Sequence, residues 1–341
     1  MNMPQIETHV SLKPYNTFGI DVPARHFVRV TTLAALRSVL SLPALQAMPR
    51  LILGGGSNIL LTQPFDGLVI KLALLGKAQV SEDDEAVHVK AMAGENWHDF
   101  VCWTIQQGWA GLENLSLIPG TVGASPIQNI GAYGVEMKDC FHSLTALEVS
   151  TGTVHTFDHA ACRFAYRDSM FKHVAPGHYI ILDVTFRLPK KPQWHTSYGE
   201  VQAELARQGV VELSAQAISD AICTIRRRKL PDPAQIGNAG SFFKNPVVST
   251  VLAESLKKQF NQMPTYPQPD GTTKLAAGWL IDQCGWKGHV EGAVGVYEKQ
   301  ALVLINRGGA AGSEICNLAK RIQHSVMAKF GIEIEPEPLI L

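Results

Sequence analysis

Two glycine-rich segments have the composition of loops that hold phosphate, and the first is Leu51-Ile-Leu-Gly-Gly-Gly-Ser-Asn-Ile-Leu-Leu61. Its first three residues suit a short buried strand that ends at the glycines. Glycine permits positive φ and lets bare backbone N–H groups approach an anion such as a diphosphate. Ser57 and Asn58 add short polar side chains that hydrogen-bond phosphate oxygens or complete the turn. Taken alone, this segment is better explained as a tight turn between two strands.

Neither of two familiar phosphate loops fits this segment. A dinucleotide-binding fingerprint needs Gly-x-Gly-x-x-Gly opening a helix, with an acidic residue about 20 positions further on. Gly54-x-Gly56 is instead followed by Ile59, and residues 71–77 contain no acid. A Walker loop needs Gly-x-x-x-x-Gly-Lys-Ser/Thr, and Gly76-Lys-Ala78 lacks both the first glycine and the hydroxyl.

The second glycine-rich segment is Ile118-Pro-Gly-Thr-Val-Gly-Ala-Ser-Pro-Ile-Gln-Asn-Ile-Gly-Ala-Tyr-Gly134. Its 17 residues include four glycines and two prolines, and a loop of this length is rarely an idle connection. Small residues offer backbone contacts and amides offer donors and acceptors: Gly123, Ala124, Ser125, Gln128 and Asn129. A loop packed on itself is the plainer explanation. The presence of two such loops favours the two sides of one large cofactor site.

Three further polar clusters lack a packing explanation: Tyr166-Arg-Asp-Ser169, Gly240-Ser-Phe-Phe-Lys-Asn245 and Glu335-Pro-Glu337. Arginine bonds a carboxylate or phosphate bidentately. A glutamate in apolar surroundings acquires a raised pKa and acts as an acid. The serine suggests a nucleophile, but the Gly-x-Ser-x-Gly elbow is absent. Taken singly, each cluster is better explained as a surface ion pair or a cap.

Composition indicates a globular enzyme. The chain has 341 residues, 46% hydrophobic and 18% charged, so we expect two or three domains with their own cores. The net charge is zero and the pI is about 7.2, which gives no electrostatic reason to expect nucleic acid or membrane as a partner. The six cysteines form no Cys-x-x-Cys pair, which favours reduced thiols over disulfides or zinc.

The N-terminus and the rest of the chain lack targeting and membrane signals. Residues 1–10 have neither a basic region nor an apolar core of a signal peptide, and no apolar run approaches a membrane span. We therefore expect a soluble, cytoplasmic protein.

The periodicity predicts helices and strands without strict alternation, which indicates an α+β fold. Residues 1–75 have the pattern of a small β-α-β-β lobe. The helices that we expect cover 33–40, 97–107, 200–208, 214–228, 251–260, 275–284 and 314–330. Thr32 and Asn96 should cap the first two, and Gly331 should end the last. The strands that we expect cover 26–30, 68–71, 87–91, 144–149, 154–157, 178–188 and 332–341. Arg226-Arg-Arg-Lys229 at a helix C-terminus complements the helix dipole, and Pro231 and Pro233 mark a domain boundary.

Taken together and in this order, the motifs resemble those of the UDP-N-acetylenolpyruvoylglucosamine reductases of bacterial peptidoglycan synthesis. Five separated segments carry the resemblance: 53–60, 118–134, 166–169, 240–245 and 335–337. The match extends from about Lys13 to Glu337, nearly the whole chain. Because five motifs occur in the expected order, the resemblance is far more specific than any one of them.

The resemblance implies a two-lobed FAD-binding fold of the vanillyl-alcohol-oxidase type, followed by a domain that closes over a sugar nucleotide. The divisions that we expect are residues 1–75 for the first FAD lobe and 76–230 for the second lobe with a tyrosine-loop insert. Residues 231–333 would form the substrate domain, and the tail 334–341 would return to the first lobe.

The resemblance also assigns ligands and residues. Non-covalent FAD would contact Gly54, Gly55, Gly56, Ser57, Asn58, Ile59, Gly123, Ala124, Ser125, Gln128 and Asn129. The UDP-sugar would contact Tyr198 on a mobile lid, Lys229, Asn245, Tyr266, Lys274 and Gln300, although caps or surface charges explain these six nearly as well. NADPH would be the co-substrate. No metal and no obligate protein partner is expected.

The implied reaction is the reduction of an enol ether conjugated to a carboxylate. Hydride passes from NADPH through FAD to the β-carbon of the substrate, and charge develops on its α-carbon and carboxylate. Arg167 and a protonated Glu337 would stabilise this charge. Ser241 matches the position of the family's proton donor to the α-carbon.

Two other functions remain open at this point. The first is an oxidase or dehydrogenase of the same flavin fold. Residues 51–61 and 118–134 contain no histidine or cysteine, which weighs against its members with covalent flavin. The second is a non-catalytic module that binds flavin or a sugar nucleotide. Such a module would have no evident use for Arg167, Ser241 and Glu337.

Overall fold

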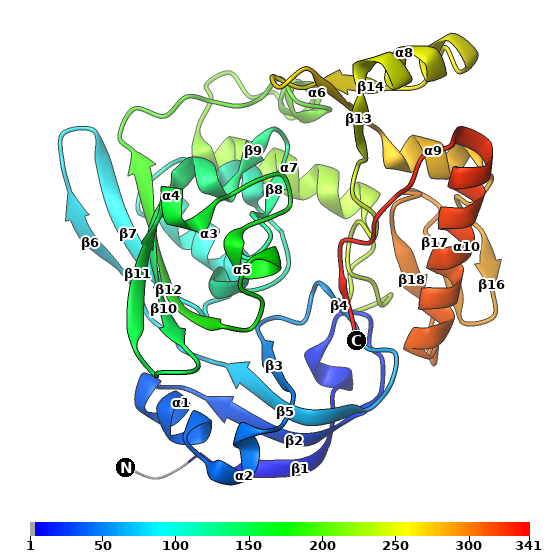
Figure 1. The fold of residues 1–341 in the computed structure, drawn as a ribbon. Helices are drawn as coiled ribbons and strands as arrows, with labels where there is room; N and C mark the ends of the chain where they lie inside the picture. The colour runs from blue at the N-terminus through cyan, green and yellow to red at the C-terminus, as the bar shows by residue number, and fades with distance from the viewer. Residues whose placement is uncertain (1–3) are drawn as a thin grey trace. The chain divides into compact units, whose positions relative to one another are not determined.

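The computed structural model describes residues 4–341, and its helices and strands are labelled in Figure 1. Helices and strands are mixed along the chain, as the α+β prediction requires. The chain divides into two units, each built from three stretches of sequence. Unit 1 comprises the described part of 1–10 with 24–56 and 66–228, and unit 2 comprises 11–23, 57–65 and 229–341.

The N-terminal sheet has the order β1-β2-β5-β3. Its elements are β1 (Ile6–Ser11), β2 (Pro23–Val30), α1 (Leu33–Leu40), α2 (Pro43–Gln46), β3 (Arg50–Leu53) and β5 (Phe65–Leu72). Helix α1 has the predicted bounds because the Thr32 side chain accepts a hydrogen bond from the Ala35 N–H at 3.1 Å and caps it. Strands β3 and β5 are parallel, which places Lys71 opposite Leu53 at the start of the first glycine loop.

The second sheet of unit 1 is antiparallel, with the order β11-β10-β12-β7-β6 (Figure 1). Its strands are β6 (Lys77–Glu82), β7 (Ala86–Met92), β10 (Phe141–Glu148), β11 (Val154–Asp158) and β12 (Tyr179–Pro189). Leu147, Ile180 and Leu182 of this sheet belong to the same apolar cluster as Leu36 and Ile70 of the N-terminal lobe. The two sheets therefore share part of their core.

Helix α3 covers one face of the antiparallel sheet. The helices of this unit are α3 (Trp97–Gln106), α4 (His159–Cys162), α5 (Met170–His173), α6 (Val201–Arg207) and most of α7 (Ala215–Lys229). The rings of Trp97 and Phe100 lie 5.8 and 5.2 Å from that of Phe186 on β12. All three side chains are buried, and each buried aromatic contributes roughly 2–3 kcal/mol. The predicted Asn96 cap is confirmed, since its side chain accepts from the Asp99 N–H.

The second glycine-rich loop forms the middle half of the connection from α3 to β10. It contains the short hairpin of β8 (Gly131–Ala132) and β9 (Val135–Glu136). One short 3-10 helix, Val122–Ala124, lies within the loop, and two others, Glu113–Leu115 and Met137–Cys140, flank it. This stretch is therefore ordered by local turns.

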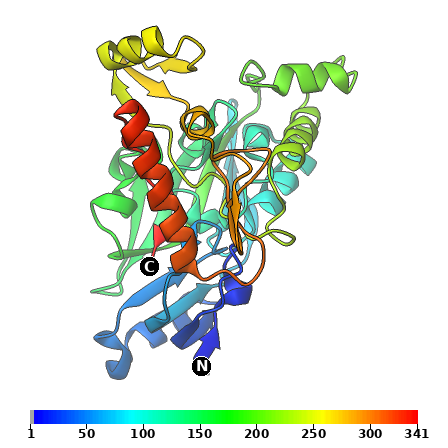
Figure 2. The ribbon, with the colours of Figure 1, turned by 90° about the vertical axis from the view of Figure 1, so that its right-hand side faces the viewer.

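Unit 2 contains two small antiparallel sheets, of order β13-β15-β14 and β16-β17-β18, and the parallel pair β19-β4. Helix α10 packs on β17, β18 and α9, and its position beside these strands can be followed in Figure 2. The elements of this unit are a 3-10 helix (Lys13–Tyr15), β4 (Ile59–Leu60), β13 (Val247–Ser249), α8 (Thr250–Gln259), β14 (Thr265–Pro267), β15 (Thr272–Leu275), α9 (Ala277–Gln283), β16 (Val290–Glu291), β17 (Val294–Val296), β18 (Leu304–Asn306), α10 (Gly312–Phe330) and β19 (Leu339–Ile340).

The predicted strand over 332–341 is too long. Only β19 is a strand there, and Pro336 makes an isolated bridge to Phe243. Proline has no N–H to donate, so Pro336 and Pro338 interrupt a regular ladder. Helix α10 ends at Gly331 as expected, because Gly331 has a left-handed φ of 66°. None of the helices within residues 4–341 is long and apolar enough to cross a bilayer.

Candidate active site

The two glycine-rich loops of unit 1 lie against each other. A Cβ atom built on Gly55 would lie 2.7 Å from the Gly120 Cα, and one on Gly54 would lie 2.5 Å from the Thr121 Oγ1. A Cβ on Gly123 would lie 2.4 Å from that of Ala93. These glycines are therefore needed because backbone segments pack closely here: the first loop on Gly120 and Thr121, and Gly123 on Ala93. The space that a bulky residue would occupy at Gly55 and Gly123 is filled by backbone and Ala93.

Lys71 is a residue of this region that the sequence prediction missed. Its ammonium group donates a hydrogen bond to the Gly54 carbonyl, and its side chain is half-buried. Burial lowers the pKa of Lys71, and the nearby charge of Arg29 lowers it further. The sequence feature that could have indicated Lys71 is its position at the end of the apolar run Leu68-Val-Ile70. This cation stabilises the carbonyl that opens the loop.

Several side chains predicted to contact the cofactor are already bonded within the second loop. The Ser125 hydroxyl donates to the Val122 carbonyl at 2.7 Å. The Asn129 amide donates to Glu136 Oε2 at 3.0 Å and to the Ala165 carbonyl at 3.1 Å, and its oxygen accepts from the Lys138 N–H. Both Ser125 and Asn129 are fully buried. Their backbone N–H groups also donate within the loop, to the Val122 and Pro126 carbonyls, so both residues shape the loop.

Arg167 lies in a tight turn whose ends are Ala165 and Asp168. These two residues exchange backbone hydrogen bonds of 3.0 and 3.2 Å, and Arg167 has a left-handed φ of 55°. Its guanidinium donates to the Gly131 carbonyl at 2.6 Å and lies 5.3 Å from the centre of the Tyr166 ring. The turn thus holds Arg167 against the second glycine loop.

Tyr198 lies beside the end of the same loop, on the segment between β12 and α6. A Cβ on Gly134 would lie 3.3 Å from that of Tyr198, and the tyrosine is 51% exposed. On the loop itself, Tyr133 lies near the half-buried Arg226 of α7. Burial raises the pKa of Tyr133, an effect that Arg226 partly offsets.

In unit 2, the segments of Ser241 and Glu337 are paired. The Glu337 N–H donates to the Phe242 carbonyl at 2.7 Å, the Lys244 N–H donates to the Glu335 carbonyl at 3.0 Å, and Phe243 bridges Pro336. The side chain of Lys244 also pairs with that of Glu335 at 3.1 Å. Two motifs almost 100 residues apart in sequence are therefore neighbours.

The Ser241 segment is held in place by Asn238, a second residue that the sequence prediction missed. The Asn238 amide is buried, donates to two carbonyls and accepts from the Gly240 N–H at 2.9 Å. Gly240 has a left-handed φ of 70°, and the Phe242 N–H donates to the Leu302 carbonyl. Among residues 4–341, the Ser241 hydroxyl makes no hydrogen bond, so it does not act as a cap.

The C-terminal tail binds the residues that follow the first glycine loop. The Asn58 amide donates to the Glu337 carbonyl at 3.2 Å, and the Leu339 N–H donates to the Asn58 carbonyl at 3.0 Å. Strand β19 then pairs with β4, which contains Ile59. The Thr62 hydroxyl and N–H both donate to the Leu341 carbonyl at 2.6 Å. Glu337 is thus fixed on both sides.

The residues predicted to bind a UDP-sugar are only partly brought together. Tyr266 on β14 and Lys274 on β15 are direct partners in an antiparallel pair, so their side chains share one face. Asn245 accepts from the Ala277 N–H and caps α9, and Gln300 accepts from the Leu302 N–H. Lys229 is the last residue of α7 and the first of unit 2's final stretch. Arg167 and Tyr198 belong to unit 1, whereas Ser241 and Glu337 belong to unit 2.

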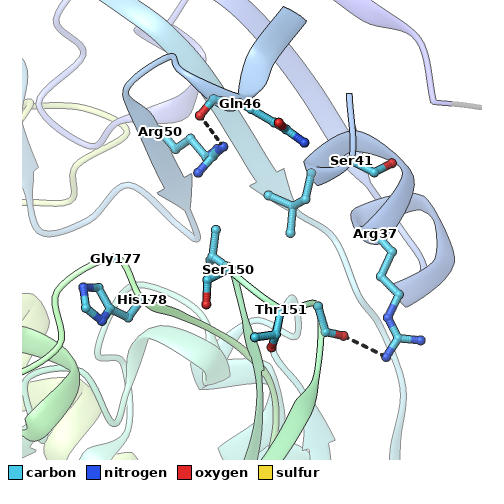
Figure 3. A pocket seen from close by; sticks show the side chains of 11 residues that line it. Arg37, Ser41, Gln46, Arg50, Ser150, Thr151, Gly177 and His178 are labelled. Atoms are coloured by element: carbon cyan, nitrogen blue, oxygen red, sulfur yellow. Dashed lines mark hydrogen bonds between the residues drawn. The ribbon is translucent and has the colours of Figure 1, made fainter. Parts of the chain in front are cut away.

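A separate cavity of about 850 Å³ in unit 1 contains none of the predicted site residues (Figure 3). Its lining comes from α1, α2 and β3 on one side and from the β10–β11 turn and Gly177-His178 on the other. Its two guanidinium groups are bonded to backbone carbonyls, Arg37 to Gly152 at 3.1 Å and Arg50 to Gln46 at 2.8 Å. These bonds give both arginines a structural role.

Comparison with known proteins identifies the relatives of this chain. A family model for the C-terminal domain of UDP-N-acetylenolpyruvoylglucosamine reductase matches residues 232–341, and one for an FAD binding domain matches residues 24–158. The UDP-N-acetylenolpyruvoylglucosamine reductases of Pseudomonas putida and Pseudomonas aeruginosa are 55% and 53% identical to it, each over 98% of both chains. The chain belongs to the UDP-N-acetylenolpyruvoylglucosamine reductase family. It is therefore an FAD-dependent oxidoreductase of peptidoglycan synthesis.

Solved structures agree on the fold. The UDP-N-acetylenolpyruvylglucosamine reductase from Thermus caldophilus is 23% identical, covers 99% of both chains and superposes with a TM-score of 0.68. The 6-hydroxy-D-nicotine oxidase from Arthrobacter nicotinovorans is 11% identical, with coverage of 97% of this chain and 87% of its own, and a TM-score of 0.56. The predicted fold class, an FAD-binding part of the vanillyl-alcohol-oxidase type with an α+β C-terminal domain, is confirmed.

The residues of unit 1 fit an FAD cofactor of this reductase family. Bare N–H groups at a glycine-rich turn favour a diphosphate, and Gly56 has the left-handed φ of 63° that such a turn uses. The Lys71 ammonium bound at Gly54 adds positive charge beside that turn. Neither loop contains a histidine or cysteine for a covalent bond to the flavin.

Proposed function

We propose that this reductase converts UDP-N-acetyl-3-O-(1-carboxyvinyl)-glucosamine into UDP-N-acetylmuramate, with NADPH as the electron donor. The observation that carries the proposal is the pairing of the Ser241 and Glu337 segments through the Glu337 N–H and the Phe242 carbonyl. This backbone pairing of two neighbouring segments, one with a serine and one with a glutamate, supports a joint role of the two residues. Family membership supports the same reaction.

FAD, when bound, supplies the hydride that adds to the β-carbon of the enolpyruvyl group. We assign the binding of its diphosphate to the backbone of Gly54–Ile59 and of Gly123–Asn129. The contact between these two segments supports this assignment, since one ligand can reach both. The cofactor is held without a covalent bond.

The remaining chemistry belongs to the side chains of the protein. Negative charge develops on the α-carbon and carboxylate of the substrate, and Arg167 binds that carboxylate with its planar fork. Ser241 donates its proton to the α-carbon, which becomes a strong base in the reaction. Glu337 in its protonated form hydrogen-bonds the developing charge and relays a proton. The Ser241 hydroxyl has no partner among residues 4–341 and is available for this step.

Substrate binding is assigned to Tyr198, Lys229, Asn245, Tyr266, Lys274 and Gln300, with Tyr198 as a lid over the diphosphate. The half-exposed position of Tyr198 beside Gly134 supports a mobile role. The shared face of Tyr266 and Lys274 supports joint contact with one ligand. The division into FAD lobes 1–75 and 76–230, a substrate domain 231–333 and a tail 334–341 remains part of this proposal.

A stopped-flow experiment on the purified holoenzyme tests the proposal. We expect flavin absorbance to be bleached by NADPH and to return on addition of the enolpyruvyl UDP-sugar. Bleaching without recovery by that substrate would contradict the assigned reaction. Recovery with a hydroxy acid or alcohol oxidation product instead would favour another flavoenzyme of the same fold.

A further inference from the structure

Three hydrogen bonds fasten the turn of Arg167 to the second glycine-rich loop. The Arg167 guanidinium donates to the Gly131 carbonyl at 2.6 Å and the Asn129 amide donates to the Ala165 carbonyl at 3.1 Å. The Ser169 hydroxyl donates to the Ile127 carbonyl at 2.6 Å. Asn129 and Ser169 are both buried, so these bonds are shielded from water and hold the turn in one place.

The backbone at both ends of this connection is in an unusual conformation. Arg167 has a φ of 55°, which a residue with a long side chain rarely adopts, and Asn129 has a φ of 46°, in the left-handed region that asparagine tolerates better than most residues. Such conformations persist only where the surrounding structure holds them, and they cluster at functional sites. The hydrogen bonds from Asn129 and Ser169 provide that restraint.

Gly131 is the residue that leaves room for the arginine. A Cβ atom on Gly131 would lie 2.9 Å from Arg167 Nη1, 3.0 Å from the Glu136 Cγ and 3.1 Å from the Val135 carbonyl oxygen. The tightest of these contacts is with the end of a long, flexible side chain. A methyl group at this position would therefore displace the guanidinium before it disturbed the β8–β9 hairpin.

We propose that Gly131 is a positioning residue for Arg167. Its missing side chain allows the guanidinium to lie on the loop, and its carbonyl accepts one of the guanidinium N–H groups. Asn129 and Ser169 fix the turn and thereby the direction of the guanidinium. This inference rests on the proposed role of Arg167 as the group that binds the substrate carboxylate.

The test is a double-mutant cycle with Gly131→Ala and Arg167→Ala in the FAD-loaded protein. Gly131→Ala should fold, hold FAD and be reduced by NADPH normally, because the guanidinium makes the tightest contact with the new methyl group and the hairpin needs to yield by only a few tenths of an ångström. Its affinity for the enolpyruvyl UDP-sugar, measured by calorimetry on the oxidised protein, should fall. Its reoxidation by that substrate should fall about 10²-fold, the loss expected for a misplacement of about 1 Å. The double variant should be no slower than Arg167→Ala alone.

The matched control is Gly152→Ala. Gly152 has a φ of 69° and no atom within 4 Å of its virtual Cβ. This variant should lower the melting temperature through backbone strain and leave substrate affinity and reoxidation unchanged. It separates a loss of stability from a displaced guanidinium. If Gly131→Ala does not fold, Ser169→Ala replaces it in the cycle.

The outcomes distinguish this inference from the proposed function. Wild-type affinity and reoxidation in Gly131→Ala, beside an impaired Arg167→Ala, would overturn the positioning role alone. An effect of Gly131→Ala that persists in full in the Arg167→Ala background would also overturn it. Wild-type reoxidation in Arg167→Ala itself would remove the role of Arg167, and the inference would fail with it.

Discussion

The backbone N–H of Glu337 donates to the carbonyl of Phe242 at 2.7 Å, so the last acidic residue of the chain is joined to the residue after Ser241. Asn58 holds Glu337 from the other side through its carbonyl. Asn58, the serine motif and the C-terminal tail therefore meet within unit 2. Ser241 and Glu337 lie on neighbouring segments, and the role of each is tested below by its own substitution.

Glu337→Gln should impair reoxidation of the flavin by the UDP-sugar on the order of 10²-fold, because an amide keeps a hydrogen bond but does not relay a proton. The backbone bond to Phe242 is unaffected by this change, so stability should remain close to wild type. Rapid-mixing absorbance and thermal unfolding measure the two effects. Normal reoxidation would remove Glu337 from the proton-transfer role.

Gly55→Val should give a protein with little or no bound FAD. The added side chain would collide with the Gly120 backbone, since even a Cβ would lie 2.7 Å from its Cα, and the two loops would be forced apart. The ratio of flavin to protein absorbance measures the loss. Gly209→Ala is the control, because its virtual Cβ has no neighbour within 4 Å. Full FAD content in Gly55→Val would show that the loops tolerate separation.

In wild-type protein, acid precipitation should release all of the FAD into the supernatant. Both glycine-rich loops lack histidine and cysteine, so they offer no residue for covalent attachment. Flavin that stays with the precipitated protein would contradict non-covalent binding.

Tyr198→Phe should raise the KM for the UDP-sugar several-fold and leave flavin reduction by NADPH unchanged. The hydroxyl group, which this substitution removes, is the part of the side chain that would hydrogen-bond the diphosphate. The ring would keep its place beside Gly134. Steady-state kinetics and single-turnover reduction separate these effects. Loss of FAD in this variant would instead give Tyr198 a role in cofactor binding or folding.

The sequence predicted those features that depend on neighbours along the chain. The caps of Thr32 and Asn96 and the end of α10 at Gly331 follow from local chemistry. Strand β1 was missed because Ile-Glu-Thr-His-Val-Ser has no regular apolar alternation. The strand predicted at the C-terminus was too long because the effect of its prolines was overlooked.

The candidate site was likewise predictable only where it depends on neighbours along the chain. Glycine motifs marked the two loops, but only the fold shows that Gly55 faces Gly120 and that Gly131 faces Arg167. Lys71 and Asn238 were missed because each bonds a backbone carbonyl or N–H group. Every residue type has these groups, so the sequence does not show which of them is the partner. Long-range partners therefore required the structure.

His98 should make the protein less stable in mild acid. Its Nδ1 accepts a hydrogen bond from the Leu117 N–H at 3.0 Å, just before the second loop. Burial lowers the pKa of His98, and Arg227 and Arg226 lower it further, whereas Asp99 opposes them. The stabilisation is therefore present above the ordinary value of 6.5 and is lost as the pH falls through the lower folded value.

Urea unfolding at about pH 7.5 and about pH 5 measures this effect. Protonation removes the acceptor for Leu117, and losing this part-buried hydrogen bond should cost about 1 kcal/mol. His98→Gln, whose side-chain oxygen accepts without titrating, should have a flatter pH dependence over this range. An equal acid sensitivity in wild type and His98→Gln would assign the effect to other groups.

The most direct test of the proposed mechanism is single-turnover kinetics of Ser241→Ala. The variant should fold, bind FAD and be reduced by NADPH at close to the wild-type rate, since Ser241 acts only after hydride transfer. Reoxidation by the enolpyruvyl UDP-sugar should fall about 10²–10⁴-fold, the usual contribution of a positioned general acid. Ser241→Cys should recover part of that rate. A Ser241→Ala protein that melts early yet reoxidises at the wild-type rate would contradict the assignment of Ser241 as proton donor.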